Sequence, residues 1–235
     1  MRFVLGALLC TALAWAQPQK ALEDQVFAQL QGMADQVRAT LLSRDLPNAT
    51  RLTTELGLAA SRFDRILNFM QLEAELPVDG PDRFYALGRV AIAAYDATDY
   101  TKAETYANEL LTLAPQHKED QSYPKRSYGD AIFYGNIVLG RVALHREYNI
   151  PKAKAYLLAA GKTPGSATLN SFGPNMTLAK ELLEIGERDI VLEFFEECRA
   201  FWKGINKPWS LDEWIATVKG CCRLPDFGPN LTYWL

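Results

Sequence analysis

The sequence predicts an all-α protein: a long N-terminal helical hairpin, then a solenoid of two to three helix pairs, then an irregular C-terminal tail. Three observations predict it. Apolar residues recur every three or four positions over two long stretches, a six-residue phrase is repeated on a helix–turn–helix frame, and Pro and Gly residues separate these segments. The expected boundaries are 17–80 for the hairpin, 81–206 for the repeats and 207–235 for a final helix and tail.

The hairpin is predicted from two apolar stripes with helical spacing. A turn is expected between them at Pro47 and Asn48, and Pro77, Gly80 and Pro81 end the second stripe. Two long helices joined by a few residues pack antiparallel. The stripes are Leu22, Val26, Leu30, Met33, Val37 and Leu41, then Leu52, Leu56, Ala59, Phe63, Ile66 and Met70.

The repeats are predicted from one phrase that occurs twice. Residues 87–92 read Leu-Gly-Arg-Val-Ala-Ile, and residues 139–144 read Leu-Gly-Arg-Val-Ala-Leu. Each copy continues through a polar turn into a second helix with an alanine near its start, Ala103 or Ala153. Two helices approach closely only where a side chain is small, so we expect these alanines at helix contacts.

These residues resemble the tetratricopeptide repeat (TPR) family. The spacing of the first copy agrees with that family's unit of about 34 residues, although Leu87, Ala94 and Ala107 replace aromatic residues usual there. A fainter unit runs over 177–203, with Val191 in place of the alanine. The resemblance rests on Leu87, Val90, Ala91, Tyr100, Ala103, Ala107 and Pro115. It implies a solenoid whose first helices line a binding groove, and the tail resembles those of bacterial exported repeat proteins with no assigned activity.

Residues 1–16 are typical of a secretory signal peptide. Arg2 supplies the positive start, Phe3–Leu13 is an apolar run, and Ala14-Trp15-Ala16 is a small-x-small cleavage site. The run is about half of the ~20 residues that a membrane-spanning helix needs, and no comparable run follows, so we expect no transmembrane segment. Export to the periplasm or the cell exterior is predicted.

Composition restricts the function. The chain has 235 residues, of which 49% are hydrophobic and 23% charged, as in an ordinary globular protein. The formal net charge of -3 gives no support to a nucleic-acid partner, because such domains usually carry a basic surface. Motifs for nucleotide binding, metal binding or nucleophilic catalysis are also missing, so we expect no cofactor, no metal and no catalytic residue.

The cysteines allow two interpretations. The mature chain keeps Cys198, Cys221 and Cys222, an odd number that leaves at least one thiol unpaired or shared with another chain. A candidate disulfide joins Cys198 to Cys221 or Cys222, because a bridge between adjacent cysteines is strained. The alternative is three buried, unpaired cysteines.

The candidate binding groove combines arginines and tyrosines. Arg89 and Arg141 occupy equivalent places in the two copies of the phrase, and Tyr95, Tyr128 and Tyr134 lie on the same predicted first helices. Arginine and tyrosine suit peptide or carboxylate recognition because they offer forked donors and rigid area. The alternative is that the arginines pair with neighbouring acids and the tyrosines lie in the core.

We therefore expect a non-catalytic module that binds a protein or peptide, as a scaffold or assembly factor of the cell envelope. One alternative is a secreted helical enzyme, carbohydrate-active, that uses pairs among Glu193, Glu196, Glu197, Asp212 and Glu213. Another is a structural part of an envelope assembly. The phrase Phe-Gly-Pro-Asn, at 172–175 and again at 227–230, is either a structural turn or a binding motif.

The signal peptide gives the first testable prediction. Cleavage after Ala16 should leave a mature chain that begins at Gln17, because the basic start, the apolar run and the cleavage site agree with one another. N-terminal sequencing of the native protein checks this. An intact Met1 on protein recovered from the cytoplasm would contradict it.

Overall fold

The computed structural model describes residues 2–118, 127–203, 207–220 and 223–231. Every regular element in these ranges is a helix and none is a strand, so the prediction of an all-α protein is confirmed. The chain divides into two compact units, Met1–Glu75 (unit 1) and Leu76–Leu235 (unit 2). No helix in the described part of the chain has both the length and the apolar character needed to cross a membrane.

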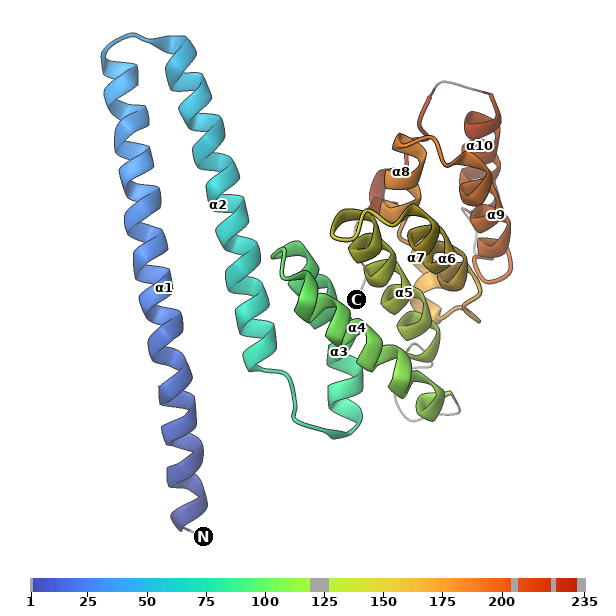
Figure 1. The fold of residues 1–235 in the computed structure, drawn as a ribbon, viewed down its shortest axis with the longest axis horizontal. Coiled ribbons are helices and arrows are strands. Elements are labelled where there is room, and N and C mark those ends of the chain that lie inside the picture. Colours follow the sequence, from blue (N-terminus) through green and yellow to red (C-terminus); the bar gives the residue numbers. More distant parts are fainter. Residues whose placement is uncertain (1, 119–126, 204–206, 221–222, 232–235) are drawn as a thin grey trace. The chain divides into compact units, whose positions relative to one another are not determined.

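Unit 1 consists of two long helices. Helix α1 spans Arg2–Leu42 and α2 spans Leu46–Ala74. They pack against each other and run in opposite directions (Figure 1). Pro47, expected in the loop between the helices, lies instead in the first turn of α2. Proline is tolerated there because a backbone N–H in the first turn has no hydrogen-bond partner within the helix.

The apolar stripes of unit 1 are only half-buried. Among the described side chains of this unit, Val26, Ala49 and Phe69 alone are buried, and Phe27 is 71% exposed. Two helices can cover each other on one side only, so the predicted stripe residues keep part of their surface open. Unit 1 therefore leaves apolar side chains partly exposed that a closed core would bury.

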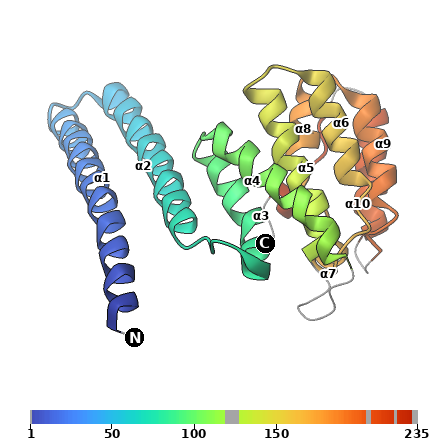
Figure 2. The same ribbon diagram turned by 60° about the horizontal axis from the view of Figure 1, so that its bottom comes forward.

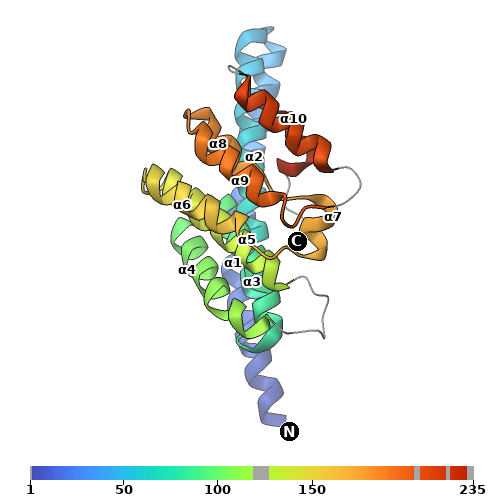
Figure 3. The ribbon, with the colours of Figure 1, turned by 90° about the vertical axis from the view of Figure 1, so that its right-hand side faces the viewer.

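Unit 2 contains eight α-helices and two short 3-10 helices in its described residues, and its helices pack largely in chain order. Helix α4 contacts α3 and α5, α5 also contacts α6, and α9 contacts α6, α8 and α10 (Figure 2). Figure 3 shows α8, α9 and α10 from a second direction. The helices are α3 (Gly80–Asp96), α4 (Tyr100–Leu113), η1 (Ala114–His117), α5 (Ser127–His145), α6 (Ile150–Gly161), α7 (Ala167–Phe172), α8 (Thr177–Glu184), α9 (Arg188–Cys198), α10 (Lys207–Lys219) and η2 (Gly228–Leu231).

One turn geometry recurs between consecutive helices. A residue with φ between 53° and 91° is followed by a residue with φ between -79° and -103° and ψ between 65° and 82°, after which the next helix begins. Where the second residue is Asp or Asn, its side chain accepts a hydrogen bond from the backbone N–H three residues on and so caps the helix. The four pairs are Arg44–Asp45, Thr98–Asp99, Tyr148–Asn149 and Gly186–Glu187.

A small or β-branched residue is buried at the same place after each of these turns. It lies four positions after the second turn residue, one helical turn into the following helix, and its exposed fraction is 0–2%. The residues are Ala49, Ala103, Ala153 and Val191. Ala103 and Ala153, predicted to lie at helix contacts, are thus fully buried. Ala49 on α2 of unit 1 lies at the same distance in sequence from its turn.

Glycine serves the same close packing on α5. A β-carbon added at Gly140 would lie 2.3 Å from the side chain of Leu178 and 3.2 Å from the β-carbon of Tyr156. The glycine in the second copy of the phrase therefore lets α5 lie close to α6 and α8, and a larger residue there would make Leu178 and Tyr156 shift.

The buried alanine gives a prediction about stability. Replacing Ala103, which is 0% exposed, by Trp should lower the free energy of unfolding by about 1–3 kcal/mol or more, because the helices must move apart. Thr101→Trp is the matched control, since Thr101 is exposed on the first turn of the same helix. Urea unfolding followed by circular dichroism compares the two. Equal stability of the Ala103→Trp variant and the unmodified chain would contradict the packing described.

Candidate functional site

The first helices of the three pairs in unit 2 meet in one cluster of charged and aromatic side chains. Arg141 on α5 forms an ion pair with Glu181 on α8, with Nη2 2.8 Å from Oε1 and Nε 3.1 Å from the same oxygen. Its guanidinium carbon lies 4.1 Å from the ring centroid of Tyr95 on α3. His145 Nε2 lies 3.3 Å from Glu181 Oε2. Arg141 therefore links α3, α5 and α8.

The Arg141–Glu181 pair is largely shielded from water. The side chains are 13% and 16% exposed, and the two nitrogens of Arg141 match the fork of the carboxylate. The Tyr95 ring adds a cation–π contact on the guanidinium face. Arg141 thus has its charge balanced within unit 2, which agrees with the alternative that this arginine pairs with a neighbouring acid.

The other predicted groove residues lie apart from this cluster. Tyr134 is 1% exposed and packs edge-on against Phe133 at 5.2 Å, so it contributes to the core. Tyr128 is half-buried against the apolar cluster around Phe84. Arg89 is exposed on α3 and forms no ion pair with any residue in the described part of the chain.

Two of the acidic candidates are held by one arginine. Arg199 Nε lies 2.7 Å from Glu196 Oε2, and its Nη2 contacts Asp212 Oδ1. Glu197 lies against Gly161, and burial raises the pKa of its carboxyl, with the Glu193 charge adding to the rise and Lys162 opposing it.

The described residues contain no group of three or more His, Cys, Asp and Glu side chains arranged to hold a metal ion. Cys198 is buried and forms no disulfide with a described residue, and burial raises the pKa of its thiol well above the usual value. Its candidate disulfide partners, Cys221 and Cys222, lie outside the described residues, and the pairing stays a prediction.

The two Phe-Gly-Pro-Asn phrases contact each other. Asn230 of the second phrase donates from Nδ2 to the carbonyl oxygens of Phe172 and Pro174 in the first, at 3.0 and 3.1 Å. The carbonyl of Asn230 accepts a bond from Met176 N at 2.7 Å. Asn230 is 6% exposed, so these bonds are made away from water. The second phrase therefore fastens the tail to the turn before α8.

The glycine of the first phrase allows this contact. Gly173 has φ 85°, and a β-carbon there would lie 2.5 Å from the Trp202 ring and 2.7 Å from Asn230 Nδ2. Phe227 of the second phrase is buried against Trp214, at 4.9 Å between ring centroids. Gly173, Phe227 and Asn230 are thus used in packing and hydrogen bonding within unit 2, whereas the Phe172 side chain is 52% exposed.

This contact gives the third prediction. Asn230→Asp should lower the free energy of unfolding by about 1–3 kcal/mol, because it replaces the donor with an oxygen that faces two carbonyl oxygens. Asn149→Asp makes the same chemical change at an exposed helix cap, where an acceptor is kept, and should leave stability nearly unchanged. Thermal unfolding followed by tryptophan fluorescence compares the two. Equal melting temperatures would show that the tail contact contributes nothing.

No protein family, curated protein or solved structure matches this chain. Its function is therefore proposed from its own residues, chiefly the recurring turns and the exposed Arg89.

Proposed function

We propose that this chain is an exported, non-catalytic interaction module of the cell envelope. Its N-terminal helical hairpin leads into a solenoid of tetratricopeptide-like helix pairs that holds a protein or peptide partner, as a scaffold or assembly factor. The observation that carries this proposal is the recurrence of one turn geometry with a small or β-branched buried residue four positions after it. Helix pairs that repeat in one register stack into extended binding surfaces.

Arg89 is the residue through which unit 2 is proposed to contact its partner. The sequence repeat makes it equivalent to Arg141, whose charge is already balanced by Glu181. Arg89 is exposed and forms no ion pair with a described residue, so its five N–H donors are available to a carboxylate or to backbone carbonyls.

Export is proposed from the signal-peptide pattern, and Pro18 supports the cleavage site. Within an uncut α1 this proline would lie inside a 41-residue helix, where it lacks the N–H of a helical hydrogen bond. After cleavage before Gln17 it would be the second residue of the chain, in the first helical turn, where proline is favoured. The mature helix would then start at a sequence suited to a helix start.

A secreted helical enzyme remains the second candidate, and Glu197 is the observation that favours it. Burial raises the pKa of this carboxyl, as in the general acids of glycosidases, and its Oε2 is buried with no hydrogen-bond partner among the described residues. If the chain cleaves a polysaccharide through this acid, Glu197→Gln abolishes the cleavage.

The interaction role is tested with Arg89→Ala. The purified mature chain serves as bait in an extract of its own cell envelope, and captured proteins are quantified by mass spectrometry. Capture of the specific partner should fall about tenfold with an unchanged melting temperature, because an exposed arginine that contacts a partner contributes to binding and not to the core. Arg223→Ala removes another exposed arginine of unit 2 and should capture as the unmodified chain does.

Arg141→Ala should behave differently from Arg89→Ala. It takes the guanidinium away from the largely shielded Glu181 carboxylate, which keeps only the contact with His145, so the chain should lose about 1–3 kcal/mol of stability. Equal capture of the same partners by the Arg89→Ala variant and the unmodified chain would rule out the proposed contact.

A further inference from the structure

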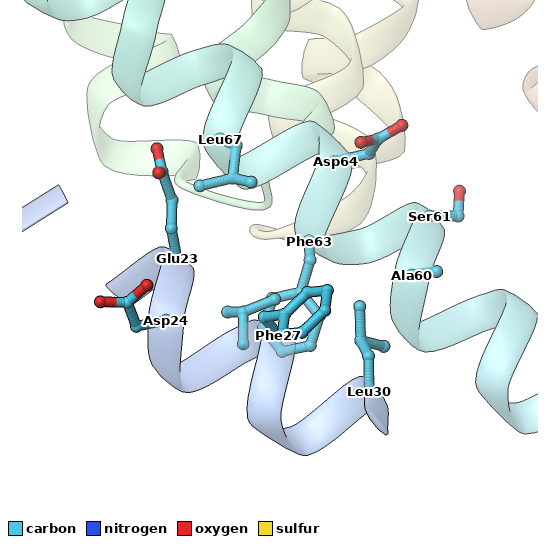
Figure 4. A pocket seen from close by; sticks show the side chains of 10 residues that line it. Glu23, Asp24, Phe27, Leu30, Ala60, Ser61, Phe63, Asp64 and Leu67 are labelled. Atoms are coloured by element: carbon cyan, nitrogen blue, oxygen red, sulfur yellow. The ribbon is translucent and has the colours of Figure 1, made fainter. Parts of the chain in front are cut away.

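A hollow of about 530 Å³ lies along the seam between α1 and α2, entirely within unit 1. Its volume falls in the range of about 300–1,000 Å³ that is usual for ligand sites. In the view of Figure 4 the rings of Phe27 and Phe63 occupy its centre. The lining residues are Glu23, Asp24, Val26, Phe27, Leu30, Ala60, Ser61, Phe63, Asp64 and Leu67.

The apolar part of the hollow combines stripe residues, such as Leu30 and Phe63, with apolar neighbours outside the stripes, such as Phe27 and Leu67. Leu30, Phe63 and Leu67 are half-buried, and Phe27 is 71% exposed. On each helix the lining positions recur every three or four residues, so the hollow follows the helix axes for about two turns. An elongated apolar seam of this kind matches the apolar face of a third helix.

The polar part of the hollow carries negative charge. Glu23, Asp24 and Asp64 line it, no lining residue is basic, and these three carboxylates form no ion pair with a described residue. Figure 4 shows them around the periphery of the apolar centre. Arg65, which follows Asp64 in the chain, donates from Nη1 to Ser61 Oγ at 3.0 Å and forms no ion pair with the three carboxylates. The uncompensated acids favour an occupant with basic residues beside its apolar face.

We propose that this hollow binds a basic amphipathic helix of a partner protein. Leu- or Phe-type side chains at i, i+3 and i+4 would fill the centre, and Lys or Arg side chains would reach Glu23, Asp24 and Asp64. This inference extends the proposed interaction role to a second surface. It uses residues 23–67, which the mature chain keeps, and none of its tests involves Arg89.

The test uses a fluorescent synthetic peptide of about 18 residues, five helical turns, with Leu and Phe on one face and Lys along both edges. Its binding to the full mature chain is followed by fluorescence anisotropy. The triple variant Glu23→Gln, Asp24→Asn, Asp64→Asn should bind about tenfold more weakly and lose most of the salt dependence, because three surface ion pairs are removed. Phe27→Ala should weaken binding at least as much. Because the Phe27 side chain is 71% exposed, its removal should leave the fold intact, so a loss of binding would not reflect misfolding.

The matched control is the triple variant Asp189→Asn, Glu193→Gln, Glu213→Gln. It also removes three negative charges, but from exposed positions of unit 2 that form no ion pair with described residues. It should therefore bind the peptide as the unmodified chain does. A second control peptide has the same composition with its apolar residues scattered around the helix, and it should not bind.

Two results would overturn the proposal. If the control triple variant loses as much affinity as the hollow variant, or the scattered peptide binds equally well, the attraction is general and no specific site exists. If sedimentation shows that the chain self-associates and that Phe27→Ala abolishes the association, a second copy fills the hollow instead. Either result leaves the Arg89 test unaffected.

Discussion

The close approach of two helices just after a capped turn is the constraint on which the rest of the structure depends. Ala103 and Ala153 are fully buried. Because protein interiors are close-packed, a side chain larger than their methyl group would push the helices apart. The turns before them place Thr98 and Tyr148 at positive φ, which costs a residue with a β-carbon about 1–2 kcal/mol. Helix capping by Asp99 and Asn149, together with the packing beyond, must offset that cost.

Once the pairs are set by these turns, the first helices α3, α5 and α8 come close enough for their side chains to interact. Arg141 reaches both Glu181 and the Tyr95 ring because α5 contacts the other two helices. The contact of Asn230 with Phe172 and Pro174 then holds the tail against the start of α8. The charged cluster therefore depends on the spacing that the turns impose.

The sequence predicted what depends on local pattern. Helical periodicity and the repeated phrase indicated an all-α chain, and the small side chains of Ala103 and Ala153 indicated buried contacts. What it could not predict depends on distant partners: Glu181 lies 40 residues from Arg141, and Asn230 lies 58 residues from Phe172. Both Phe-Gly-Pro-Asn phrases were visible, yet their contact runs through backbone carbonyls, which every residue has. The hollow of unit 1 could not be predicted for another reason: a stripe pattern does not show how much of each side chain a single neighbouring helix covers.

The most direct test of the account is the backbone conformation at the recurring turns. Backbone resonance assignment of the mature chain by NMR would give φ at Arg44, Thr98, Tyr148 and Gly186 from chemical shifts and three-bond couplings. We expect left-handed values of φ at all four residues, each followed by a helix. Right-handed helical or extended values at Thr98 or Tyr148 would contradict the shared turn and the helix contacts that follow it.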